Sequence, residues 1–159
     1  MKPCKKSPGF SLIELIICLF LLGGFYVFST YGYHKFLVRY RLEGAARGIA
    51  SDFQAARMKA IAQNRSYRIV IRPEKGEYFL EKESFSPPGT WRGAEEGWVR
   101  KFNDPQNPYY FPGVVIVSRT YDPVFLPRGS VIGTTVLIKN EGGQRKIVLS
   151  SQGRIRMEE

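Results

Sequence analysis

The sequence contains very little cysteine and histidine. Its 159 residues include two cysteines and one histidine. The cysteines, Cys4 and Cys18, lie near the N-terminus, and none occurs from Leu19 to Glu159. That longer part of the chain therefore has neither a disulfide nor a cysteine metal site. We expect the protein to use no metal and no cofactor.

Motifs for catalysis are also missing from the sequence. It has no glycine-rich phosphate loop, no metal-ligand cluster and no nucleophile motif. His34 stands alone just beyond the N-terminal apolar segment, and Glu95 and Glu96 lie in "RGAEEGWVR", which has the composition of a solvated loop. We therefore expect no catalytic residue and no enzyme activity.

Acidic residues are outnumbered by basic ones. The 24 lysines and arginines against 14 aspartates and glutamates give a formal net charge of +10. A basic surface can meet nucleic acid, anionic lipid or an acidic protein, or it can serve solubility alone. With 43% hydrophobic and 24% charged residues, the composition is that of a globular chain, and the length suits one domain plus an anchor.

One long apolar segment lies near the N-terminus. From Phe10 to Phe28 the only ionisable side chains are Glu14, Cys18 and Tyr26. As a helix, this segment would span roughly 28 Å, close to the hydrocarbon thickness of a bilayer. The sequence "STYGYHKFLVRY" that follows offers no convincing cleavage site for a secretory signal peptide. We interpret the segment as a membrane anchor, with the basic N-terminus cytoplasmic and the remainder across the membrane.

Glu14 is the unusual residue of this segment. A charged group inside a membrane is costly and normally marks a function or a partner, unless it reaches the interface or is protonated. The surrounding "GFSLIEL", Gly9 to Leu15, resembles the processing site of type IV prepilins and pseudopilins. The resemblance implies that a prepilin peptidase cuts between Gly9 and Phe10 and methylates the Phe10 amine. Pro8 departs from the family, which often has a basic residue there.

The position of Glu14 would have a physical purpose in a filament. Cleavage creates a new amine at Phe10, which the Glu14 carboxylate of a neighbouring subunit could face. A buried charge is tolerated when it is paired and is costly when it is alone. The pair would therefore favour one axial offset between the staggered helices.

A helical pattern continues beyond the apolar segment. Apolar residues recur at spacings of three and four and predict one helix from about Ser11 to about Gln63. Arg47, Asp52 and Lys59 fall away from this apolar stripe. The stripe consists of Val38, Leu42, Ala45, Ile49, Phe53, Ala56 and Ala60.

Six or so short strands are predicted after the helix. Ser66–Arg72 alternates, with Tyr67, Ile69 and Ile71 on one face. After the turn "PEKG", the further predicted strands are "EYFLEKE", a short one near Trp98–Phe102, "GVVIVSR", "TTVLIKN", "RKIVLSS" and "GRIRM". The order predicts an α+β fold whose apolar helix stripe packs on one face of an antiparallel sheet.

The segment from Ser84 to Pro112 is rich in loop-forming residues and in aromatic ones. Its rings could form a protein-binding patch or cover the open face of the sheet, and we favour the second interpretation. The aromatic residues concerned are Trp91, Trp98, Phe102, Tyr109, Tyr110 and Phe111.

A wider resemblance extends over most of the chain. The segments "SDFQAARMKAIAQNRSYRIVI", "VFLPRGS" and "IVLSSQGRIRM" resemble the helix-to-strand junction, the late strands and the closing segment of GspH/FimT-type minor pseudopilins. The resemblance implies a pilin-like fold. Its parts would be a leader (1–9), the transmembrane half of the helix (10–32) and a periplasmic domain (33–159) with its outer helix half at about 33–63 and its sheet at about 66–157.

The resemblance also implies a function in assembly. The chain is expected to be a minor pseudopilin of a type II secretion system, held in the bacterial inner membrane and drawn into a periplasmic pseudopilus. Its partners would be a prepilin peptidase, other pseudopilins or pilins, the inner membrane and secreted proteins. The alternative is a FimT-like minor pilin that binds DNA for uptake by a type IV pilus.

Four basic residues near the C-terminus bear on that alternative. Arg145, Lys146, Arg154 and Arg156 cluster on the predicted last hairpin, and Arg154 and Arg156 would share a strand face. Such a strip can contact phosphates, and some FimT-like proteins bind DNA through an arginine-bearing C-terminal region. It can equally be a solvated edge that resists strand pairing. Since Glu158 and Glu159 lie directly beyond this strip and would weaken it, DNA is the partner that we do not favour.

Overall fold

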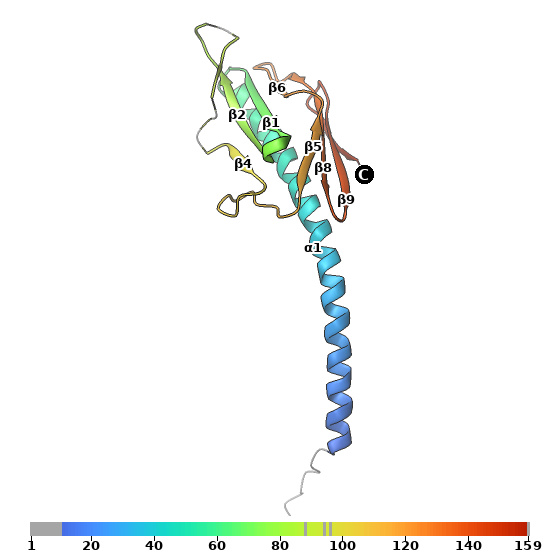
Figure 1. The fold of residues 1–159 in the computed structure, drawn as a ribbon. Coiled ribbons are helices and arrows are strands. Elements are labelled where there is room, and N and C mark those ends of the chain that lie inside the picture. The colour runs from blue at the N-terminus through green and yellow to red at the C-terminus, as the bar shows by residue number, and fades with distance from the viewer. Residues whose placement is uncertain (1–10, 88, 94, 96, 159) are drawn as a thin grey trace, which may run out of the picture. The chain divides into compact units, whose positions relative to one another are not determined.

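The computed structural model describes residues 11–87, 89–93, 95 and 97–158, without the side chains of 29–31. Helix α1 runs over Leu12–Ala62, within one residue of the predicted bounds at each end, and is followed by the short 3-10 helix η1 at Pro73–Lys75 and by strands (Figure 1). The chain divides into two compact units, one that ends at Phe36 and one that comprises Leu37–Glu159.

The first unit contains the apolar part of α1. Its described side chains from Ser11 to Phe28 are all exposed. By length and composition, α1 meets the requirements of a membrane-spanning helix. Because none of the described residues covers these apolar side chains, they need an apolar environment such as a bilayer or other apolar helices.

The second unit contains two antiparallel sheets instead of the single predicted sheet. Sheet A has the order β3-β2-β1-β6-β7, and β4 also pairs with β2. Its strands are β1 (Tyr67–Arg72), β2 (Glu77–Glu83), β3 (Trp91–Arg92), β4 (Val99–Lys101), β6 (Val124–Phe125) and β7 (Val131–Ile132). Sheet B has the order β10-β9-β8-β5. Its strands are β5 (Val115–Arg119), β8 (Thr134–Asn140), β9 (Gly143–Leu149) and β10 (Ile155–Glu158).

The chain passes from sheet A to sheet B at Gly133, between β7 and β8. A Cβ atom at this position would lie 2.3 Å from the backbone oxygen of Leu149. Only glycine allows the two backbone segments to approach so closely. This close approach lets the chain leave sheet A and enter sheet B within one residue.

The outer part of α1 packs against both sheets (Figure 1). Except for the half-buried Val38, every residue of the predicted apolar stripe is at most 4% exposed. The predicted strand face is also confirmed, because Tyr67, Ile69 and Ile71 are buried. Sheet B contributes residues such as Ile138 and Ile147 to the same core. The predicted α+β class is confirmed.

Asp52 corrects one detail of the helix prediction. The periodicity places Asp52 away from the core, but its side chain is buried, with 4% of the residue exposed. The hydroxyl of Tyr78 in β2 and Nε of Arg100 in β4 donate hydrogen bonds to its Oδ2 atom, at 2.8 and 3.1 Å. Strands β2 and β4 of sheet A thus cover a side of α1 that lies outside the apolar stripe.

Two aromatic rings of the 84–112 segment, Tyr109 and Phe111, lie on the helix and not on the open sheet face that we favoured. A Cβ atom at Gly44 would be 3.1 Å from the ring of Phe111, and one at Gly48 would be 3.9 Å from that of Tyr109. Phe102 and Phe111 meet edge to face, with ring centres 5.6 Å apart. Trp91 fits the prediction, since Arg68 on the outer face of β1 stacks over its ring at 4.5 Å. The small helix residues create the room that these rings fill.

Candidate functional site

Glu14 forms a cap at the beginning of α1. The backbone N–H of Ser11 donates a hydrogen bond to Oε2 of Glu14 at 3.2 Å. Ser11 and Glu14 therefore have the S-x-x-E spacing of a capping box and one of its two hydrogen bonds, the one from the Ser11 N–H to the Glu14 carboxylate. Our sequence analysis missed this role, although the spacing of the two residues is a known signal for a helix start.

The cap leaves part of the carboxylate available. An ionised carboxylate can accept about four hydrogen bonds, and within the described residues Oε1 of Glu14 accepts none. The positive end of the helix dipole also favours a negative charge in the first turn. Glu14 can therefore cap its own helix and still receive an amine from another subunit. Gly9 and Phe10 lie outside the described residues, so the cut between them and its methylation stay predictions.

The four basic residues near the C-terminus do not form one cluster. Arg145 and Lys146 are consecutive in β9, so their side chains point to opposite faces of sheet B. Nε of Arg145 lies 3.4 Å from Oε2 of Glu43 in α1. On the other face, Nζ of Lys146 lies 3.2 Å from Oε2 of Glu158, its cross-strand neighbour in β10. The predicted basic strip is thus divided, and two of its members are held by carboxylates.

Arg154 and Arg156 do lie together, as the sequence predicted. Both are exposed, and both line a cavity of about 240 Å³ together with Val148, Ser150 and Gln152. Neither guanidinium takes part in an ion pair within the described part of the chain. The pair can therefore hold one anionic group, but it is too short to follow a nucleic-acid backbone over many phosphates.

The buried carboxylate of Asp52 does not have the surroundings of a catalytic base. Its hydrogen-bond partners, Tyr78 and Arg100, hold it within the core of the second unit. Burial raises the pKa of the Tyr78 hydroxyl well above its ordinary value, and the charge of Asp52 and its hydrogen bond add to that effect. In the described residues no group of three His, Cys, Asp or Glu side chains could hold a metal ion. The arrangement serves packing.

Comparison with known families identifies most of the second unit. The model of the GspH family, described as type II transport protein GspH, matches residues 45–153. The pilin-like protein PilA1 of Thermus thermophilus is 30% identical over 162 residues, which cover 94% of this chain and 97% of the relative.

Solved structures show the same fold at low identity. The minor pseudopilin EpsH from the type 2 secretion system of Vibrio cholerae has a TM-score of 0.57 and 12% identity, over 74% of this chain and 96% of EpsH. The type IV minor pilin FimU of Pseudomonas aeruginosa has a TM-score of 0.53 and 18% identity, over 78% of this chain and 92% of FimU. The predicted pilin-like fold is confirmed.

Proposed function

Because the chain belongs to the GspH family, whose members are pilin-like pseudopilins, we propose that it is a minor pseudopilin of a type II secretion system. It would be a structural subunit, anchored in the bacterial inner membrane and assembled into a periplasmic pseudopilus that supports protein export. It would act through contacts with other subunits and not through chemistry of its own.

One observation carries the proposal. The match to the GspH family begins at residue 45, whereas the processing motif Gly9–Leu15 and the apolar segment lie entirely before it. The N-terminal motif is therefore independent of the family match. Both signals nevertheless favour the same class of protein, a subunit cut by a prepilin peptidase and assembled through its N-terminal helix.

Assembly would depend on Glu14 and on the new N-terminus. After the cut between Gly9 and Phe10, the Phe10 amine of one subunit would pair with the Glu14 carboxylate of its neighbour. In an apolar bundle of helices, either charge alone would be costly. The pair would therefore select the axial offset at which the two groups meet. The sheet domain would supply lateral contacts.

A minor pilin of a type IV pilus is the second candidate. It is favoured by the name of the 30% identical relative, a pilin-like protein, and by the likeness in fold to the minor pilin FimU. Uptake of DNA through the C-terminal cations is the less favoured form of this candidate, because Glu43 and Glu158 engage Arg145 and Lys146.

Deletion of the gene separates the two candidates. The deletion strain is scored for secretion of exoproteins, for surface pili and for natural transformation. The proposed function predicts a secretion defect with normal piliation and transformation, restored by the wild-type gene. Normal secretion combined with a loss of pili or of transformation would contradict it and support the type IV pilus subunit.

A further inference from the structure

A cavity of about 430 Å³ lies where the chain enters the second unit. It is formed by the first helical residues of that unit and the β8–β9 turn. Its volume is within the range of small-ligand sites. The lining residues are Arg39, Leu42, Gly142, Gly143, Gln144 and Arg145.

The walls of this cavity are held in place by hydrogen bonds. Nδ2 of the buried Asn140 donates to the carbonyl oxygen of Val38 at 2.6 Å, and its Oδ1 accepts from the backbone N–H of Gly142 at 2.9 Å. A Cβ atom at Gly142 would lie 2.8 Å from Val38, so the turn is closely seated on α1. The cavity is therefore a built feature of the fold and not a gap beside a loose loop.

Two guanidinium groups from distant parts of the chain meet at this cavity. Arg39 is exposed and takes part in no ion pair or hydrogen bond within the described residues. Arg145 is oriented by Glu43, which also accepts a hydrogen bond from Arg47 at 3.0 Å. Two arginines thus engage the Glu43 carboxylate, and Arg39 lines the same cavity as Arg145. Planar guanidinium groups bind phosphate oxygens with paired hydrogen bonds.

The segment around Arg39 has the composition of a membrane interface. Residues 31–41, "YGYHKFLVRYR", combine aromatic and basic side chains directly after the apolar run. Tyr33, Phe36 and Tyr40 are each more than 60% exposed. Aromatic residues are typical of the headgroup layer, and arginine and lysine attract anionic lipids there. Ten residues lie between Phe28 and Arg39, so the chain can carry Arg39 at most about 40 Å from the apolar run.

We propose that this cavity binds the phosphate of an anionic phospholipid headgroup, with Arg39 as the phosphate ligand and with Arg145, which Glu43 holds at the cavity wall, as a second positive charge beside it. Gln144 lines the same cavity, and a glutamine amide can form hydrogen bonds with headgroup hydroxyls. The site would hold the sheet domain at the membrane surface until the subunit enters a filament. The proposal rests on the proposed membrane anchorage.

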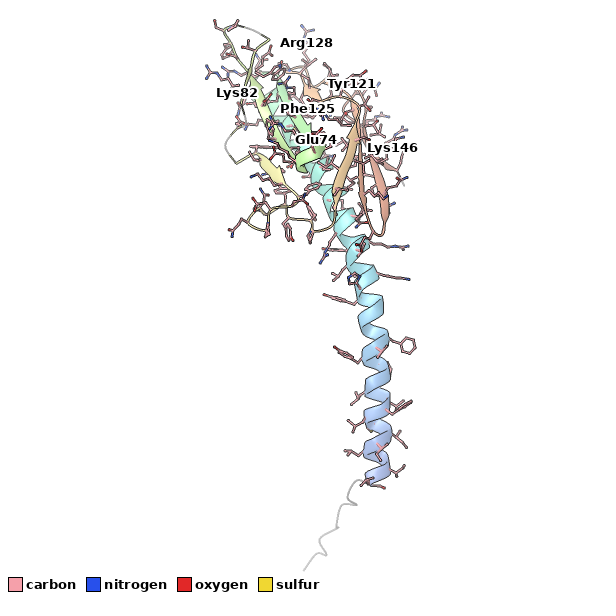
Figure 2. All side chains as sticks on the ribbon, viewed as in Figure 1. Glu74, Lys82, Tyr121, Phe125, Arg128 and Lys146 are labelled. Carbon is pink, nitrogen blue, oxygen red and sulfur yellow. The ribbon has the colours of Figure 1, made fainter. Side chains whose placement is uncertain are left out.

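The test uses the full chain in lipid nanodiscs that contain phosphatidylcholine with or without phosphatidylglycerol. Lipids that stay bound are identified by native mass spectrometry. Wild-type protein should retain phosphatidylglycerol selectively, and Arg39→Gln should lower that retention about tenfold through loss of a charged hydrogen bond. Arg128→Gln is the matched control, because it removes one exposed cation outside the cavity (Figure 2). Since Arg39 is exposed and unpaired within the described residues, its variant should fold normally.

The possible outcomes separate the sources of the ligand. Inorganic phosphate and glycerol phosphate are added as competitors of phosphatidylglycerol. Partial competition supports a phosphate site, whereas binding of free phosphate without a lipid preference would overturn the lipid assignment. Equal effects of Arg39→Gln and Arg128→Gln would overturn the site itself. Insertion without lipid selectivity contradicts only this inference, but failure to enter nanodiscs would also contradict the proposed anchor.

Discussion

Nε of Arg100 in β4 lies 3.1 Å from Oδ2 of Asp52 in α1, and both side chains are largely withdrawn from solvent. The same oxygen accepts a hydrogen bond from Tyr78 in β2. The guanidinium group of Arg100 also stacks on the ring of Tyr109, 3.9 Å from its centre. One buried carboxylate thus joins the helix, sheet A and the aromatic 84–112 segment.

Replacing Asp52 with alanine should strongly destabilise the second unit. Arg100 would then be a buried cation without its partner, a change that costs about 3–5 kcal/mol. The loss is measured by urea unfolding of the fragment Leu37–Glu159, which should fold alone because its core lies within it. As a control, Arg47→Ala breaks an exposed pair with Glu43 and should cost less than about 1 kcal/mol. Equal losses for the two variants would contradict this account.

Stability of the same fragment should fall at alkaline pH because of Tyr78. Burial and Asp52 hold the pKa of Tyr78 well above its ordinary value, whereas in the unfolded chain it ionises near pH 10. Above about pH 10 the unfolded state therefore releases a proton that the folded state keeps, and the free energy of unfolding decreases as pH rises.

Tyr78→Phe should make that alkaline decrease smaller. At neutral pH the substitution should lower the free energy of unfolding by about 1–3 kcal/mol, since Asp52 loses a buried hydrogen-bond donor. Tyr121→Phe serves as the control, because Tyr121 is 67% exposed, and it should change neither quantity. Urea unfolding of the three proteins between about pH 7 and pH 11 provides the measurement. If the free energy of unfolding of Tyr78→Phe decreases with alkaline pH as steeply as that of wild type, Tyr78 is not the cause of the decrease.

The burial of Asp52 shows where sequence reasoning stops. Periodicity located the stripe from Leu42 to Ala60 because a helix face repeats with a fixed period. It could not identify Asp52 as buried, because the partners Tyr78 and Arg100 lie 26 and 48 residues away. Only the tertiary fold brings a donor from β2 and another from β4 to one carboxylate.

The local sequence pattern also predicted the longer strands, but not the shortest strands or the contacts between strands. Alternation predicted Tyr67–Arg72 and Thr134–Asn140 almost to the residue. It did not predict β3 or β7, since two residues are too few to show a period. The separation of Lys146 from Arg145 follows from strand alternation, but the pairing of Lys146 with Glu158 depends on the register of β10 against β9.

Two substitutions of Glu14 should separate its two roles. Glu14→Gln keeps an acceptor for the Ser11 N–H, as in other capping boxes, but removes the charge. We expect normal membrane insertion and helix content, and a loss of crosslinks to neighbouring filament subunits. Glu14→Ala should lose both the cap and the crosslinks. Site-specific crosslinking in cells reports assembly, and unchanged crosslinks in Glu14→Gln would show that the charge has no pairing role.

Replacing Arg154 and Arg156 together with alanine tests nucleic-acid binding. We expect the fragment Leu37–Glu159 to bind DNA weakly and the double variant to behave nearly like wild type. The two arginines are too short a pair to follow a nucleic-acid backbone, and the nearby Lys146 is engaged by Glu158. Gel shifts at two salt concentrations provide the measurement. Tight binding that weakens steeply with salt and disappears in the double variant would favour the DNA-uptake pilin instead.

The mass of the protein after co-expression with a prepilin peptidase tests the central claim most directly. A pilin-like subunit should lose residues 1–9 and gain one methyl group on the Phe10 amine. Gly9→Leu should block the cut, because the peptidase must admit the side chain before the scissile bond, whereas Gly9→Ala should be tolerated better. An intact N-terminus, or a cut beyond Phe28, would contradict the proposal that this chain is processed and assembled as a pseudopilin.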